Sequence, residues 1–62
     1  MPMTPKEMIS LLQQNNFIIV SQNGSHMKLR NPQTNSQVIV PCHCKDLKKG
    51  LEQRILKQAG LK

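Results

Sequence analysis

Residues 24–30, Gly-Ser-His-Met-Lys-Leu-Arg, contain the side chains of this chain that are best suited to chemistry. Alternate residues of a strand point to the same face, so His26, Lys28 and Arg30 are expected to form one row, with the two apolar residues between them on the other face. An imidazole takes or gives a proton near neutral pH, and two cations can stabilise negative charge on phosphorus. This combination suits phosphodiesters. RNA supplies its own nucleophile, the 2′-hydroxyl, for which one histidine can act as general base.

The same alternation is also typical of an ordinary exposed strand. In that interpretation His26 is a polar residue on the solvent side and has no reaction to perform. The pattern His-x-Lys-x-Arg is short, so the residues alone leave both interpretations open.

Cys42, His43 and Cys44 form a second group of reactive side chains. Thiolate and imidazole groups bind zinc, but three adjacent residues cannot surround a tetrahedral ion, and the chain has two histidines in all. We therefore interpret His43 as an ordinary loop histidine; the alternative is that it approaches RNA or contacts a partner protein. The two cysteines lie two positions apart in an extended segment, near the upper limit of Cα separation for a disulfide, so we expect free thiols.

Nine Lys and Arg residues stand against three Asp and Glu residues, for a net charge of +6. This balance favours nucleic acid as a partner, and it also fits a basic surface that docks an acidic protein. Lys45, Lys48 and Lys49 would meet phosphates if the partner is nucleic acid, and the sequence fits a merely solvated run of charge equally well. The sequence has no Trp or Tyr ring on which single-stranded bases could stack, so RNA recognition must depend mainly on contacts to the RNA backbone. Three scattered acidic residues also argue against a two-metal nuclease.

The length of 62 residues predicts a single domain over 1–62 with a thin core. No apolar run approaches the roughly 18 residues that would span a membrane, and residues 1–4 lack the features of a signal peptide. We therefore expect a cytoplasmic protein that does not bind membranes.

Thr4, Pro5 and Glu7 predict the start of a helix, since Thr4 and Glu7 can form a capping box and Pro5 fits the first helical position. The helix should run to about Asn15. Asn15 and Asn16 can end it, because asparagine tolerates the left-handed conformation. The buried stripe of this helix is predicted to comprise Met8, Leu11 and Leu12.

Three strands are predicted in the middle of the chain. Residues 17–22 are rich in β-branched side chains, and the Asn-Gly pair at 23–24 is a strong signal for a two-residue hairpin turn. A second strand should therefore begin at Ser25. A third strand over 37–40 is ended by Pro41, so the strands should form an antiparallel meander.

Gly50 can open a final helix, and Gly60 with Leu61 can end it in a Schellman motif. Its apolar positions are Leu51, Ile55, Leu56 and Ala59. The order α-β-β-β-α then implies an α+β fold of two layers, with both helices on one face of the sheet. The other face, which carries His26, should be open to solvent.

In order and spacing, several segments together resemble the HicA family of toxin endoribonucleases. They are the Gly24-Ser25-His26 motif with Lys28, the Val40-Pro41 strand end with His43 beyond it, and residues 45–50 (Lys-Asp-Leu-Lys-Lys-Gly) leading to 55–61 (Ile-Leu-Lys-Gln-Ala-Gly-Leu). The resemblance covers nearly the whole chain. It implies a fold like that of double-stranded-RNA-binding domains, with a three-stranded antiparallel sheet and two helices on one face.

The resemblance further implies an mRNA interferase of a type II toxin-antitoxin module. Its single catalytic histidine would be His26, with no metal or other cofactor, and a HicB-type antitoxin would cover the site in a hetero-oligomer. The resemblance assigns no role to Cys42 or Cys44. The predicted site comprises His26 as the catalytic residue, Lys28, Arg30, Lys45, Lys48 and Lys49 as RNA-binding residues, and Ser25 and His43 as accessory residues.

Two other functions remain open on the residues alone. One is a non-catalytic RNA-binding module that blocks translation by occupying its target. The other is a basic subunit whose surface exists mainly to bind an acidic protein.

Overall fold

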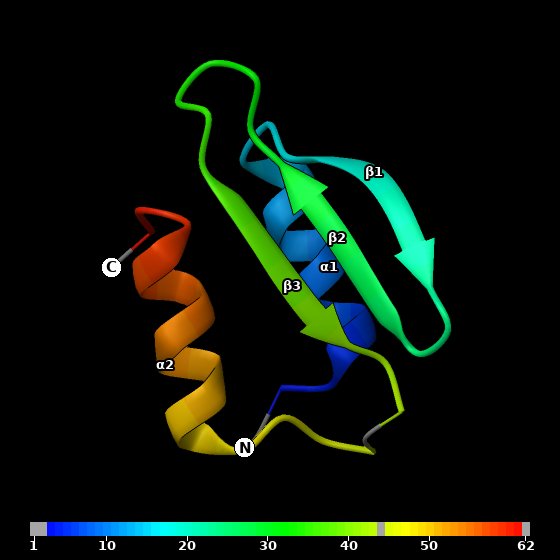
Figure 1. The fold of residues 1–62 in the computed structure, drawn as a ribbon. Helices are drawn as coiled ribbons and strands as arrows, with labels where there is room; N and C mark the ends of the chain where they lie inside the picture. Colours follow the sequence, from blue (N-terminus) through cyan, green and yellow to red (C-terminus); the bar gives the residue numbers. More distant parts are fainter. Residues whose placement is uncertain (1–2, 44, 62) are drawn as a thin grey trace.

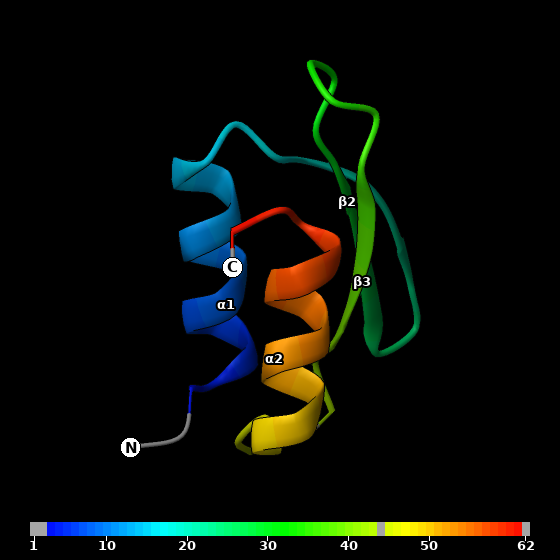
Figure 2. The same ribbon diagram turned by 90° about the vertical axis from the view of Figure 1, so that its left-hand side faces the viewer.

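The computed structural model describes residues 3–43 and 45–61. Its elements are α1 (Pro5–Gln14), β1 (Ile18–Asn23), β2 (His26–Arg30), β3 (Gln37–Pro41) and α2 (Lys49–Gln58). The strands form one antiparallel sheet in the order β1-β2-β3, and both helices lie on the same side of it (Figures 1 and 2). The predicted α-β-β-β-α order and two-layer arrangement are confirmed.

The two ends of α1 follow the predicted local chemistry. The Thr4 hydroxyl accepts a hydrogen bond from the Glu7 backbone N–H, and the Glu7 carboxylate accepts one from the Thr4 N–H at 2.9 Å. At the other end Asn16 is left-handed, with φ of 73°, and the Phe17 N–H donates to the Leu12 carbonyl at 3.0 Å. The helix therefore stops in a Schellman motif that turns the chain into β1.

The second helix begins one residue earlier than predicted, at Lys49, and ends as predicted. Gly60 is left-handed, with φ of 75°, its N–H donates to the Lys57 carbonyl, and the Leu61 N–H donates to the Leu56 carbonyl at 2.9 Å. These two bonds satisfy carbonyls that would otherwise be unpaired at the helix end.

A small apolar core fills the space between the sheet and the helices. Its buried members are Met8, Leu12, Phe17, Leu29, Val38, Val40, Leu47, Ile55 and Ala59. Leu11, predicted to be buried, is only half-buried, while Met8 and Leu12 are fully buried. Among the described residues, no helix combines the length and apolar character that a bilayer crossing requires.

The β1–β2 hairpin differs from the prediction in its turn. Asn23 still belongs to β1 and pairs with His26, so the two turn residues are Gly24 and Ser25 instead of Asn23 and Gly24. Gly24 has φ of 62°, and Ser25 is not among the positive-φ residues, which is the pattern of a type II′ turn with glycine in its first central position. The second strand consequently starts at His26, one residue later than predicted.

A β-bulge interrupts β1 and decides which of its side chains meet β2. The register changes between Ile19 and Ser21, so Val20 has no partner, while Ile19 pairs with Leu29 and Ser21 pairs with Lys28. The extra residue reverses the alternation of faces along β1. Ser21 therefore lies on the outer face, away from the helices, and Ile19 on the inner face.

The pleat of β2 and β3 places the predicted side chains on the predicted faces. Leu29 and its partner Val38 are buried against the helices. On the outer face Lys28 pairs with Ile39, and the exposed His26 lies at the start of the strand. The alternation predicted for the segment from His26 to Arg30 is therefore confirmed.

Candidate active site

A hollow of about 340 Å³ opens on the outer face of the sheet at the hairpin end of β2. It is lined by Ser21, Asn23, His26, Lys28 and Ile39. Two cross-strand rows build it, because Asn23 pairs with His26 and Ser21 pairs with Lys28. The sheet thus gathers an imidazole, an ammonium group, a hydroxyl and an amide around one solvent-open space.

His26 and Lys28 are the two groups of this hollow that bear directly on phosphate chemistry. They are two residues apart on one strand face, which corresponds to about 7 Å along β2. His26 is exposed and Lys28 is half-buried. An imidazole that solvent and substrate can reach, beside a cation held by the strand, can exchange a proton and stabilise an anion in the same place.

His43 lies beside His26, although the two are 17 positions apart in sequence. Their ring centroids are 5.7 Å apart and the ring planes are tilted by 55°. The cause is backbone pairing: His26 is opposite Pro41, and the Cys42 N–H donates to the Ser25 carbonyl, which extends the β2–β3 ladder beyond the end of β3. Continued alternation then carries His43 to the face of His26.

A second hollow, of about 390 Å³, continues from the first toward α2. Both hollows are lined by Lys28 and Ile39, so they meet at this pair. The second hollow adds Arg54, an exposed cation on α2. Sequence reasoning missed Arg54; its place between Leu51 and Gln58, at intervals of three and four residues, was the available signal.

The other predicted cations do not line the hollow that contains His26. Arg30 is at the opposite end of β2, and its guanidinium donates a hydrogen bond to the side-chain oxygen of Asn35 in the β2–β3 loop. Lys45 and Lys48 are exposed in the segment between β3 and α2, and Lys49 is exposed as the first residue of α2. Ser25, the predicted accessory residue before His26, is exposed in the hairpin turn.

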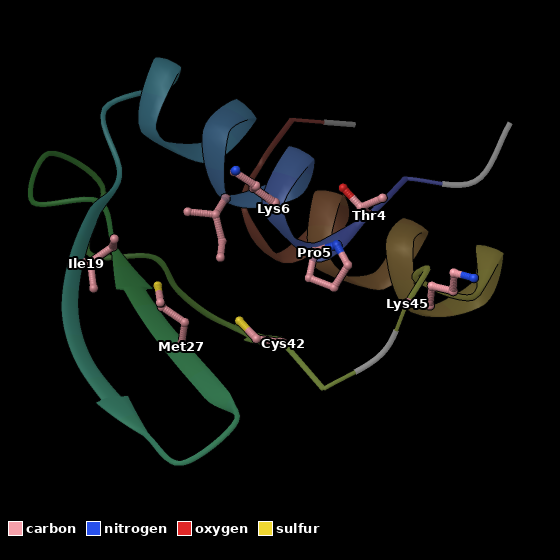
Figure 3. Close-up of a pocket in the computed structure, with 8 residues that line it drawn as sticks. Thr4, Pro5, Lys6, Ile19, Met27, Cys42 and Lys45 are labelled. Carbon is pink, nitrogen blue, oxygen red and sulfur yellow. The ribbon is translucent and has the colours of Figure 1, made fainter.

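A third hollow, of about 430 Å³, lies on the inner side of the sheet, and neither histidine lines it. Figure 3 shows Ile19, Met27 and Cys42 on the sheet side of this space and Pro5 and Lys6 on the α1 side. The space lies between α1, which contributes Pro5, Lys6 and Ile9, and the inner side of β1 and β2, which contributes Ile19 and Met27. Its lining is mostly apolar, with Lys6 and Lys45 as its cations, and it contains no imidazole that could act as a general base.

The reactive residues after β3 are only partly described. Cys42 is exposed, and its Sγ lies 3.6 Å from the Val40 carbonyl oxygen. Cys44 lies outside the described residues, so the expectation of two free thiols is not tested. Within 3–43 and 45–61, no three His, Cys, Asp or Glu side chains cluster in a way that could hold a metal ion.

Comparison with known protein families gives a match over nearly the whole chain. A sequence model described as the HicA toxin of bacterial toxin-antitoxin systems matches residues 5–61. A search among curated proteins finds no relative. The matched residues include all those that line the two hollows adjoining Lys28 and Ile39, and they include both histidines.

Proposed function

The chain belongs to the HicA toxin family of bacterial toxin-antitoxin systems, and from this premise we propose that it is an endoribonuclease that cleaves mRNA in the cytoplasm. The observation that carries the proposal is the exposed imidazole of His26 in a polar hollow that also contains Lys28. His26 acts as general base on the 2′-hydroxyl of RNA. Lys28 stabilises the negative charge that grows on the phosphate. Because the nucleophile belongs to the substrate, the reaction requires no metal-bound water.

The RNA strand follows the line of cations along the outer face. One phosphate lies between His26 and Lys28, and the next segment of backbone enters the hollow that Arg54 lines. Four further basic residues bind flanking phosphates and raise the overall affinity. They are Arg30, Lys45, Lys48 and Lys49, with Ser25 and His43 as accessory contacts near the scissile phosphate.

We propose that a HicB-type antitoxin covers this same face in a hetero-oligomer. Two large apolar side chains, Ile18 and Ile39, are each 52% exposed there, on the face that also carries His26. Exposed apolar residues grouped with functional polar residues are typical of a surface that a protein partner covers. A partner with acidic groups would complement the net charge of +6 and exclude the RNA phosphate.

The proposal is tested by incubating the purified protein with a defined mRNA in the presence of EDTA. We expect cleavage at discrete sites, because the substrate supplies its own nucleophile and side-chain acid–base catalysis does not depend on a metal ion. Mapping the ends by sequencing gives the preferred site. Intact RNA after exposure to an excess of folded protein would rule out the proposed activity.

Masking by the antitoxin is tested by modification of histidine with diethyl pyrocarbonate, followed by peptide mapping. In the free protein we expect ready modification of His26, because its side chain is exposed. In the purified complex we expect His26 to be protected, since the partner removes it from solvent. Equal modification in both states would exclude direct covering of His26, even if the antitoxin still inhibits cleavage.

A further inference from the structure

The two histidines of this chain form a pair at the hairpin end of the sheet. Both side chains are exposed, and their ring centroids are 5.7 Å apart. The backbone holds the two rings near each other, because the hydrogen bond from the Cys42 N–H to the Ser25 carbonyl joins the two segments that carry them. The side chain of Cys42 faces the inner hollow, so its neighbour His43 turns to the outer face.

Cleavage of RNA by its 2′-hydroxyl requires two proton transfers, and one histidine can perform only the first at the moment of attack. The 2′-oxygen must lose a proton, and the 5′-oxygen that leaves must gain one, because an alkoxide is a poor leaving group. Near neutral pH the imidazole is the side chain that exchanges protons most readily, whereas arginine cannot give up its proton. A second imidazole beside His26 is suited to this task.

Resting on the proposed endoribonuclease function, we infer that His43 is the general acid that protonates the leaving 5′-oxygen. A proton donor must approach within about 2.6–3.2 Å of the oxygen that it serves. Rings whose centroids are 5.7 Å apart allow a single phosphate to touch both imidazoles from the open side. His43 is then a catalytic residue rather than a loop histidine.

The step balances in atoms and protons. The 2′-oxygen forms a bond to phosphorus as the bond between phosphorus and the 5′-oxygen breaks. The 2′-hydroxyl proton passes to His26, and a protonated His43 gives its proton to the 5′-oxygen. The products are a 2′,3′-cyclic phosphate and a free 5′-hydroxyl. Proton exchange with water restores both rings.

The test compares an ordinary RNA that carries a mapped cleavage site with the same RNA in which sulfur replaces the 5′-oxygen at that site. A thiolate leaves without protonation, so this substrate has no need of a general acid. We expect His43→Gln to cleave ordinary RNA about 10²- to 10⁴-fold more slowly than the wild type. We expect it to cleave the sulfur substrate at nearly the wild-type rate, whereas His26→Gln is slow on both substrates.

Each result has a distinct meaning. Equal rates for wild type and His43→Gln on ordinary RNA would overturn the role of His43 while leaving the proposed function intact. An equal loss on both substrates would assign His43 to binding or folding instead, and circular dichroism of the variant separates these two. If the wild type cleaves neither substrate, the endoribonuclease function itself falls, and the role of His43 falls with it.

Discussion

Replacing His26 with glutamine is expected to abolish RNA cleavage while leaving the fold intact. Glutamine preserves hydrogen-bonding capacity but cannot take a proton near neutral pH, so the loss of general-base catalysis should lower the cleavage rate by about 10²- to 10⁴-fold. The side chain of His26 is exposed and outside the core cluster, so the free energy of unfolding should change by no more than about 0.5 kcal/mol. Single-turnover cleavage and urea denaturation measure the two quantities, and growth after induction reports toxicity.

The matched control for this variant is Gln22→Ala. Gln22 is exposed on the neighbouring strand, and it pairs with Met27, which places it on the opposite face of the sheet from His26. It should therefore cleave RNA like the wild type. Full toxicity of His26→Gln, with RNA binding retained, would instead favour a module that blocks translation by occupancy. Equal slow cleavage by wild type and variant would indicate a contaminating nuclease.

The helix ends of this fold follow from local sequence because each is decided within a few residues. The capping box of Thr4 and Glu7 requires only two side chains at the right spacing. Asn16 and Gly60 tolerate positive φ, and each ends a helix in the motif that its residue type favours. Long-range packing is not needed to explain where these helices end.

The hairpin shows where local signals are insufficient. The Asn-Gly pair at 23–24 and the Gly-Ser pair at 24–25 both fit a two-residue turn, and the choice depends on which register buries Leu29 and its neighbours. The bulge at Val20 has no local signature, because three consecutive β-branched residues fit either face. A turn over 23–24 would have set a different residue of β1 opposite His26 in place of Asn23.

The part of the candidate site that lies on one strand could be predicted from the sequence. The parts contributed by other elements could not. Alternation along β2 is enough to place His26 and Lys28 on one face. The nearness of His43 depends on the ladder continuing past Pro41, a residue that lacks an N–H and usually ends a strand. Arg54 joins the site only through the packing of α2 beside β3, which periodicity does not specify.

The site rests on a small apolar core, so Leu29→Ala is expected to remove a large part of the free energy of unfolding. Leu29 is completely buried on the inner face of β2, the middle strand, where it pairs with the buried Val38. Truncation of a buried leucine costs about 2–5 kcal/mol. A chain of 62 residues is expected to have a total stability of only about 3–9 kcal/mol. Urea denaturation followed by circular dichroism should show a much lower midpoint or no folded baseline.

Ile39→Ala provides the comparison, because it removes an aliphatic side chain from the adjacent strand at a position that is 52% exposed. Its stability loss should stay well below that of Leu29→Ala, since little apolar surface returns to water. Equal losses for the two variants would contradict the assignment of the inner and outer faces. Any RNA cleavage lost in Leu29→Ala should return at lower temperature, where the folded fraction recovers. The loss in His26→Gln should persist at every temperature, because the missing proton acceptor is a chemical defect and not a folding defect.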